Sequence, residues 1–457
     1  MKSSKPTQPI RRPLLQSLQR PWGRRGLVVL ISLVGLPLGL LGGCFNLPEP
    51  GPDAGSGSGI GIVPGSVPTP EPGTETPAAV PVAGPLAKQT LDPSQPTAPT
   101  PELLQESWLA YRQRFIQIDG RVIDWQAASR STSESQAYAM LRAVMVDDRE
   151  TFERTLNWAE ANLARRTDGF TDAPLTDQLW AWDWGQQGEK WGIVDQNFAS
   201  DGDIDAVTAL ILASRRWNRP DYLSLAQAKL KDIWDLSTVT VGEQRYLLPG
   251  PALAFDKGDR IQLNPSYLAP YAFRLFATVD PSRDWLSLVP SSYQVLEESS
   301  NLSSLGLPSD WVELSRADGR FRPVASPSAL KSQYGFDAYR VWWRVAIDLA
   351  KYNAPEARQY LTTHLQEFQR IWEQDQRIVA QYGLDGSPLA DYEATSQYGM
   401  LYAAFREIDP QIAAELFQFK LLPRYNAGIW DDESAYYSQN LAWLGLFPFE
   451  DLTEVWP

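Results

Sequence analysis

The sequence predicts an all-α fold in which about a dozen helices pack as two concentric layers. Apolar residues recur mainly at helical spacing after residue 100, and Gly, Pro and Asp separate the periodic segments. Strand signals are few; Val239–Val241 and Arg245–Leu248 suggest one small ribbon. No short solenoid-type repeat is visible. The expected helices cover 102–117, 133–146, 149–165, 204–217, 221–235, 267–277, 284–299, 332–352, 355–373, 391–406, 411–419 and 434–446.

The composition of the chain excludes several kinds of partner and site. The chain has 457 residues and a formal net charge of -14, which argues against a nucleic-acid partner, because phosphates demand a basic surface. It has one cysteine, Cys44, and one histidine, His364, so neither an internal disulfide nor a Cys/His zinc cluster can form. No metal or cofactor is expected. Carboxylates are the plentiful candidate acids and bases. The 18 Trp and 18 Tyr suit either sugar rings or a large helical core.

Residues 1–44 read as a targeting segment. Arginines precede an apolar run over Leu27–Leu41, which ends in Gly42, Gly43 and Cys44. This ending resembles the bacterial lipoprotein cleavage box, which implies that Cys44 becomes the lipidated first residue; a transmembrane anchor is the alternative. Residues 45–100 are rich in Pro, Gly, Ser and Thr and predict a disordered tether before a domain over 101–457. We therefore expect an exported lipoprotein facing the periplasm or cell exterior.

Glu134 is the first candidate for chemistry. It opens an apolar helix in the segment STSESQAY. Ser131 and Glu134 also fit the S-x-x-E capping box, in which the glutamate only satisfies backbone N–H groups. Spacing alone favours this capping interpretation.

Three aspartates alternate in ASDGDIDA (199–206), just before an expected helix. A calcium loop would need Gly at its sixth and Glu at its twelfth position, where the chain has Ala206 and Leu212. Stabilisation by the helix dipole explains one or two aspartates at such a place, and three less well. Close like charges tend to raise a pKa, which suits acid–base work and makes Asp201 and its neighbours candidates.

Aromatic residues surround a third acidic segment. Asp337 and Arg340 fall on one expected helical face and could form an ordinary ion pair. Trp342 and Trp343 follow them. Two further aromatic clusters, WAWDWG with Trp182 and SAYY with Tyr437, could belong to a core or to a sugar-binding cleft.

Together these segments resemble glycoside hydrolase family 8. The stretch ASDGDIDAVTALILASRRW (199–217) closely follows that family's signature. The resemblance covers 101–457, and the order of segments is similar to that in the family's bacterial endoglucanases associated with cellulose synthesis. These segments are GRVIDW (120–125), TSESQAYAML (132–141), WAWDWG (180–185), YLLPG (246–250), LNPSYL (263–268), SDWV (309–312), FDAYRVWWRVA (336–346) and SAYY (434–437).

The resemblance implies an (α/α)6 barrel of six inner and six outer helices and an inverting hydrolase. Glu134 matches the general acid and Asp337 the general base, with Arg340 beside it. Asp201 matches the signature aspartate, which would grip and distort the sugar, because an inverting mechanism forms no covalent intermediate. We expect the glutamate to carry the proton and Asp337, beside its arginine, to stay ionised.

Trp182 and Tyr437 fall where the resemblance places sugar contacts. One departure is Phe336, since relatives often have Tyr before the base; Tyr334 could supply the missing hydroxyl. The expected activity is endo-acting hydrolysis of β-1,4 bonds in cellulose or a cellulose-like β-glucan, with a cellulose synthase complex as a candidate partner. Xylan, chitosan or mixed-linkage β-glucan are alternative substrates. A non-catalytic glycan-binding lipoprotein and a structural barrel of an envelope complex are alternative functions.

Overall fold

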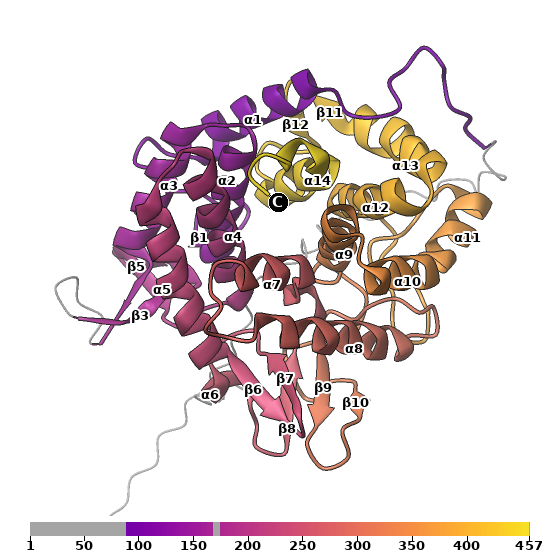
Figure 1. Cartoon of the computed structure of the whole chain (residues 1–457). Helices are drawn as coiled ribbons and strands as arrows, with labels where there is room; N and C mark the ends of the chain where they lie inside the picture. Colours follow the sequence, from indigo (N-terminus) through magenta and orange to yellow (C-terminus); the bar gives the residue numbers. More distant parts are fainter. Residues whose placement is uncertain (1–87, 168–173, 457) are drawn as a thin grey trace, which may run out of the picture. The chain divides into compact units, whose positions relative to one another are not determined.

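The computed structural model describes residues 88–167 and 174–456, all within one compact unit of the chain (Figure 1). The predicted targeting segment with Cys44 and most of the predicted tether lie outside the described residues. Among the described helices, none combines the length and the apolar character needed to cross a bilayer.

Two layers of helices alternate along the chain (Figure 1). The inner layer contains α2 (Ser133–Met145), α4 (Ser200–Arg216), α7 (Pro270–Ala277), α9 (Tyr339–Tyr352), α12 (Thr395–Ile408) and α14 (Tyr436–Leu446). The outer layer contains α1 (Pro101–Phe115), α3 (Arg149–Asn162), α5 (Pro220–Ser237), α8 (Leu288–Asn301), α10 (Pro355–His364) with α11 (Gln366–Asp375), and α13 (Pro410–Leu416). This alternation confirms the predicted (α/α)6 barrel.

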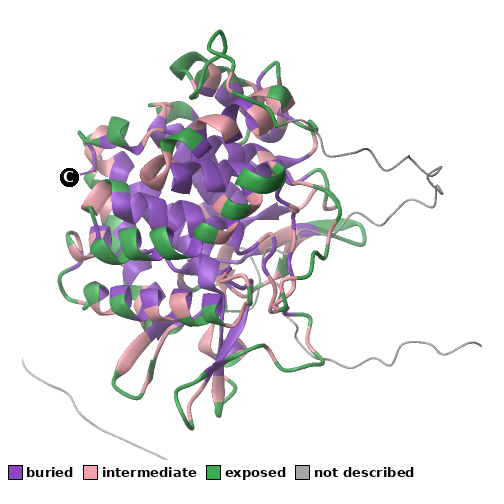
Figure 2. Cartoon of the chain, turned by 90° about the vertical axis from the view of Figure 1, so that its right-hand side faces the viewer, coloured by how far each residue is buried: buried purple, intermediate pink, exposed green. Residues whose placement is uncertain are grey.

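Burial separates the two layers. Every residue of α2 is buried, whereas α1 buries only one face, as expected for a helix between a core and solvent. Figure 2 shows the same contrast, with helices buried throughout inside and striped helices outside. The inner helices therefore form the core, and their ends are the places where a site can open to solvent.

The described strands all belong to one kind of connection between the helices. The connections from an inner helix to the next outer one contain no described strand, and all but the one between α7 and α8 are three residues long or shorter. The connections that lead from outer to inner helices carry every described strand. These are β1 (Ser131–Thr132), β2 (Ala164–Arg166), β3 (Leu175–Trp180), β4 (Asp183–Gln187), β5 (Lys190–Asp195), β6 (Thr238–Val241), β7 (Gln244–Leu247), β8 (Arg260–Leu263), β9 (Val312–Ser315), β10 (Phe321–Arg322), β11 (Tyr425–Asn426) and β12 (Ile429–Trp430). Elaborated connections thus gather at the N-terminal ends of the inner helices. The predicted ribbon is confirmed as β6 paired with β7.

Several predicted helix boundaries differ from the structure by a few residues, and three of the differences bear on the site or on the outer layer. Helix α4 begins at Ser200 and not at residue 204, so Asp201 and Asp203 lie in its first turn and not before it. Helix α9 begins at Tyr339 and not at residue 332, because the preceding segment is held by tertiary contacts: Asp310 accepts a hydrogen bond from the backbone N–H of Ala338 (2.9 Å). The predicted helix over 355–373 is divided into α10 and α11.

Residues 88–100, which the sequence assigned to the tether, contact the barrel. The side chain of Gln376 pairs with both backbone groups of Gln89 (2.6 and 2.9 Å). The side chain of Gln418 pairs in the same way with Asp92 (2.7 and 3.0 Å). The folded part therefore begins by residue 88 and not at 101.

Candidate active site

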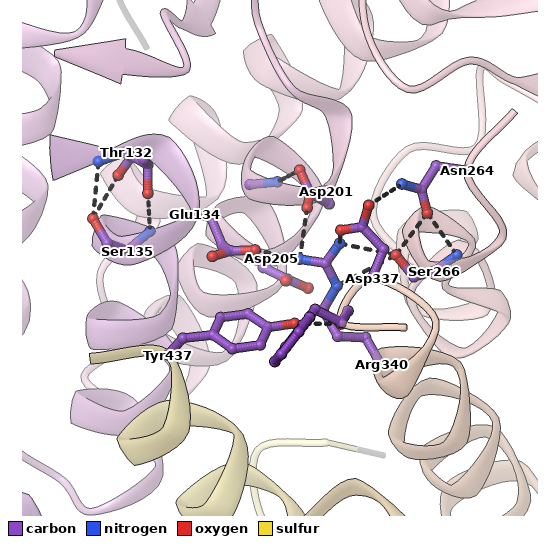
Figure 3. A network of polar contacts seen from close by, with 12 residues as sticks. Thr132, Glu134, Ser135, Asp201, Asp205, Asn264, Ser266, Asp337, Arg340 and Tyr437 are labelled. Atoms are coloured by element: carbon purple, nitrogen blue, oxygen red, sulfur yellow. Dashed lines mark hydrogen bonds and ion pairs between the residues drawn. The ribbon is translucent and has the colours of Figure 1, made fainter. Parts of the chain in front are cut away.

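The candidate site lies at the N-terminal ends of α2, α4, α9 and α14 (Figure 3). Glu134 comes from the first turn of α2 and Asp201 from the first turn of α4. Asp337 lies two residues before α9, and Arg340 follows in the first turn of that helix. The barrel thus brings together the three carboxylates and the arginine that the sequence singled out.

Glu134 is not a helix cap. The capping box of α2 is formed one residue later than predicted, by Thr132 and Ser135, whose side chains bond to each other's backbone N–H groups (3.0 and 3.1 Å). The carboxylate of Glu134 is buried and accepts hydrogen bonds from the Tyr436 hydroxyl (2.7 Å) and from Nη1 of Arg340. The capping interpretation is therefore wrong, and the carboxylate faces the site.

The three alternating aspartates of α4 have different surroundings. Asp201 lies 3.5 Å from Nη1 of Arg340, toward the site. Asp205, one turn later, forms two bonds with Arg344 (2.8 and 2.9 Å). Asp203 accepts a hydrogen bond from a backbone N–H of β3 (3.2 Å). Only the first aspartate joins the site, and the other two bind neighbouring elements of the barrel.

A polar cradle holds the candidate base. Asp337 bonds through Oδ1 to Nη2 of Arg340 (2.7 Å), which confirms the predicted ion pair. Its Oδ2 accepts hydrogen bonds from the side chains of Asn264 and Trp311 (both 3.2 Å). Ser266 accepts from Nη2 of the same arginine (2.9 Å), and its own hydroxyl donates to Asn264 (2.7 Å). The segment 264–266 therefore holds both the carboxylate of Asp337 and the guanidinium of Arg340 in place.

One buried guanidinium contacts three buried carboxylates. Arg340 contacts Glu134, Asp201 and Asp337 and has no exposed surface. Burial raises the pKa of Asp201 to about 7, against the opposing charge of the arginine. Burial likewise raises the pKa of Asp337 to about 6. The cluster can therefore hold a proton near neutral pH, as a property of the group and not of one residue.

A small pocket adjoins the cluster, and its lining includes the predicted Trp182. The lining residues are Thr132, Ser133, Glu134, Trp182, Ala199, Asp201, Tyr267 and Tyr436. The predicted Tyr437 has a different contact: its hydroxyl donates to the backbone carbonyl of Phe336 (2.7 Å), directly before the candidate base. Tyr334 does not supply a hydroxyl to the base, because its oxygen accepts from Trp342 (3.1 Å) and Gln397 (3.3 Å).

The sequence interpretation missed several residues of the site. Tyr436 was noted only as an aromatic neighbour, yet its hydroxyl binds Glu134. Asn264 and Ser266 were visible only as part of LNPSYL, one of the segments that resemble the family. An Asn before Pro predicts the start of a tight turn, which Asn264 does cap, but no local signal says that its amide reaches Asp337.

The barrel with a carboxylate pair at its mouth has the architecture of a carboxylate-dependent glycoside hydrolase. Residues 93–448 match the family model described as Glycosyl hydrolases family 8, and the chain belongs to that family. An "Endoglucanase" of Xanthomonas axonopodis pv. citri is 37% identical over 208 residues, which cover 45% of this chain and 51% of that protein. The matched stretch thus spans about half the length of the first curated relatives.

Solved structures share the fold. The endo-β-1,4-glucanase CMCax from Acetobacter xylinum superposes with a TM-score of 0.59 at 26% identity, covering 76% of this chain and 97% of that one. A xylanase from Teredinibacter turnerae superposes with a TM-score of 0.61 at 17% identity, covering 79% of this chain and 96% of that one, and supports the fold alone.

Proposed function

We propose that this protein is an endo-acting, inverting hydrolase of β-1,4 bonds in cellulose or a cellulose-like β-glucan. The observation that carries the proposal is the placement of Glu134 and Asp337 on either side of one guanidinium group, at the mouth of a barrel of this family. The relatives named endoglucanase support the β-1,4-glucan as substrate and the endo mode of cleavage.

Each carboxylate has a distinct role in the proposed reaction. The carboxylic acid of Glu134 donates its proton to the glycosidic oxygen as the bond to the anomeric carbon breaks. The Asp337 carboxylate removes a proton from a water molecule, whose oxygen attacks that carbon from the opposite face. One proton is given and one is taken, so the pair returns to its starting state after proton exchange with solvent. Asp201, buried beside them, binds sugar hydroxyls and favours the distorted ring of the transition state.

Inversion requires a particular spacing of the two carboxyls. An inverting pair is about 6.5–9.5 Å apart because water must fit behind the sugar, whereas a retaining pair is only about 5–5.5 Å apart. Arg340 stands between Glu134 and Asp337 and bonds to one through Nη1 and to the other through Nη2. We therefore expect the carboxyls of Glu134 and Asp337, which this guanidinium bridges, to be separated by the wider distance.

The decisive experiment follows the first anomer released. The full-length chain is incubated with β-1,4-gluco-oligomers, and proton NMR is recorded before mutarotation. We expect the α-anomer first, and Asp337→Asn should abolish turnover while oligomer binding persists. Initial release of the β-anomer would reject inversion. Faster cleavage of xylan, chitosan or mixed-linkage β-glucan than of a cellulosic polymer would make that polymer the substrate in place of cellulose. No cleavage of any polymer in this panel would favour a non-catalytic role.

We further propose that the protein is exported and held at a membrane by a lipid on Cys44, where the tether lets the barrel reach a polymer or a cellulose synthase complex. The support is the sequence pattern around this cysteine and the proline-rich stretch after it. Cys44→Ser should release the protein from membranes or block its maturation. An intact N-terminus with unchanged membrane association would contradict the anchor.

A further inference from the structure

A pair of stacked tryptophans lies on the hairpin formed by β4 and β5. The rings of Trp184 and Trp191 have centroids 5.3 Å apart and planes inclined by 27°. Both side chains are on the same face of the hairpin, because Trp184 pairs with Ile193 and Trp191 with Gln186 in the antiparallel register. Trp191 is 45% exposed, so much of this large indole is open to solvent.

The pair is held in place from below. Trp184 packs edge-on against Trp158 of α3, at 5.2 Å between centroids. The guanidinium of Arg121 lies 4.5 Å from the ring of Trp184 and 4.7 Å from that of Trp191. Arg121 is itself largely buried and donates to the hydroxyl of Ser131 (2.8 Å). Because these partners order the two rings before any ligand arrives, a bound ligand would lose little side-chain entropy there.

The tryptophan pair is connected to the candidate acid through a three-stranded sheet. In it, β1 pairs with β4, and the partner of Asp183 is Thr132, which caps the helix of Glu134. Trp191 pairs with Gln186, which lies three residues beyond Asp183 on β4, a displacement of roughly 10 Å along an extended strand. An oligomeric chain can bridge that distance from the catalytic pocket, whereas a single sugar cannot.

The neighbours of the exposed indole are polar. Gln186, Gln187, Glu189 and Lys190 are all exposed on the same hairpin, and its turn uses Gly188 with a φ of +62°. A flat apolar ring bordered by amides and charged side chains can stack on the C–H face of a pyranose while the neighbours bind hydroxyls. Such a surface suits an uncharged polysaccharide better than an apolar protein partner, which would desolvate the polar border.

We propose that Trp184 and Trp191 form a glycan-binding platform outside the catalytic pocket, on which a neutral β-glucan chain rests while another part of it is cleaved. The proposal rests on the proposed function for its choice of polymer. The exposed face of Trp191 makes the contact, and Trp184 with Arg121 supports that ring from behind. The platform acts on polymers and leaves the chemistry at the carboxylates unchanged.

Trp191→Ala in the full-length protein tests the platform. We expect KM for a soluble cellulosic polymer to rise about tenfold, which corresponds to about 1.4 kcal/mol, with kcat within twofold of wild type. Cleavage of the shortest oligomer that the wild type accepts should be unchanged, because it does not reach the platform. Trp191→Tyr, which keeps a flat ring, should recover most of the polymer affinity. Leu286→Ala is the matched control: this residue is 52% exposed but lies in the connection from inner α7 to outer α8, at the opposite end of the barrel.

A binding measurement separates this proposal from the proposed function. The same variants are run in native gels containing hydroxyethylcellulose, where retardation reports binding without turnover. Reduced retardation of Trp191→Ala, but not of Leu286→Ala, supports the platform even if the wild type cleaves nothing, in which case only the hydrolase proposal fails. Equal migration of wild type and Trp191→Ala overturns the platform, whether or not the enzyme is active.

Discussion

Replacing Arg340 by Met tests whether one guanidinium balances the carboxylate cluster. The substitution keeps the length of the side chain and removes its charge and its bonds to Glu134 and Asp337. Removing one partner of a buried ion pair typically costs about 3–5 kcal/mol, because the other charge stays buried without compensation. We expect a loss of stability in this range and a rate on polymer at least about 10²-fold lower, since base and acid both lose their orientation.

The pH dependence makes this prediction specific. The pKa of Asp337 is raised by burial to about 6, and the charge of Arg340 opposes that rise. Without the arginine the pKa of Asp337 rises further, so the acidic limb of kcat/KM should move up by at least about one pH unit. The upper bound on this shift is the energy of a close charge pair, about 4 kcal/mol at an effective dielectric constant of 20.

Stability should follow the same titration even if activity is undetectable. A carboxyl whose pKa is higher in the folded than in the unfolded chain binds more protons when folded, so stability falls as pH rises from the unfolded to the folded pKa. For the wild type this window runs from about 4 to about 6, given the ordinary Asp337 value of 3.8. In Arg340→Met the window extends higher, so the difference in melting temperature between the two proteins should widen from pH 5 to pH 8.

Arg344→Met provides a matched control. Arg344 is buried one helical turn further along α9 and forms two bonds to Asp205. Its loss should destabilise the barrel by a similar amount and move the acidic limb of kcat/KM less than Arg340→Met does, because it also bonds to the backbone carbonyl of Ser266 (2.8 Å) and not to Asp337. An unchanged acidic limb and a pH-independent difference in melting temperature for Arg340→Met would refute the reasoning. Equal upward shifts of the limb in both variants would show that the effect is not local to the cluster.

Three further predictions concern the start of α2, the start of α4 and the candidate base before α9. Glu134→Gln should preserve the fold and lower turnover by roughly 10²–10⁴-fold, measured as initial rates. Thr132→Ala, which removes the cap of α2, should lower stability by about 1 kcal/mol in thermal melts and keep turnover. Gly202→Ala should cost about 1–3 kcal/mol in urea unfolding, because its new Cβ would lie 2.7 Å from the hydroxyl of Ser133. In the wild type, kcat/KM should fall as pH decreases through about 6, where Asp337 takes up its proton; a flat profile down to pH 4.5 would exclude it as the base.

Most of the fold could be predicted because the inner helices are strongly patterned. Helix α2, predicted over 133–146, runs over Ser133–Met145, and α14, predicted over 434–446, runs over Tyr436–Leu446. The failures occur where tertiary contacts override local preference. Residues 332–338 have helical periodicity, but the carboxylate of Asp310 accepts a hydrogen bond from the backbone N–H of Ala338. The same carboxylate leaves no space for a side chain at position 335, because a Cβ added to Gly335 would lie 2.6 Å from it. A distant residue cannot be inferred from the pattern of the segment that it holds.

The site was only partly predictable for a similar reason. Family-like motifs identified the carboxylates, yet Asn264, Trp311 and Tyr436 come from three different connections or helix starts and meet only in the folded barrel. Each is a single polar side chain in an apolar or turn-like segment. Their residue types are compatible with packing alone, so their function depends on geometry that a linear pattern does not contain.

The position of the arginine shows how the charges of the site depend on one another. Glu134 and Asp201 lie in the first turns of α2 and α4, where the helix dipole favours negative charge. Arg340 lies in the first turn of α9, where the same dipole disfavours a cation. A buried cation at this position is stable only because carboxylates surround it, and the cation in turn opposes the rise that burial imposes on the pKa of Asp201 and of Asp337. Replacing Arg340 should therefore change the protonation of both aspartates as well as remove its own contacts.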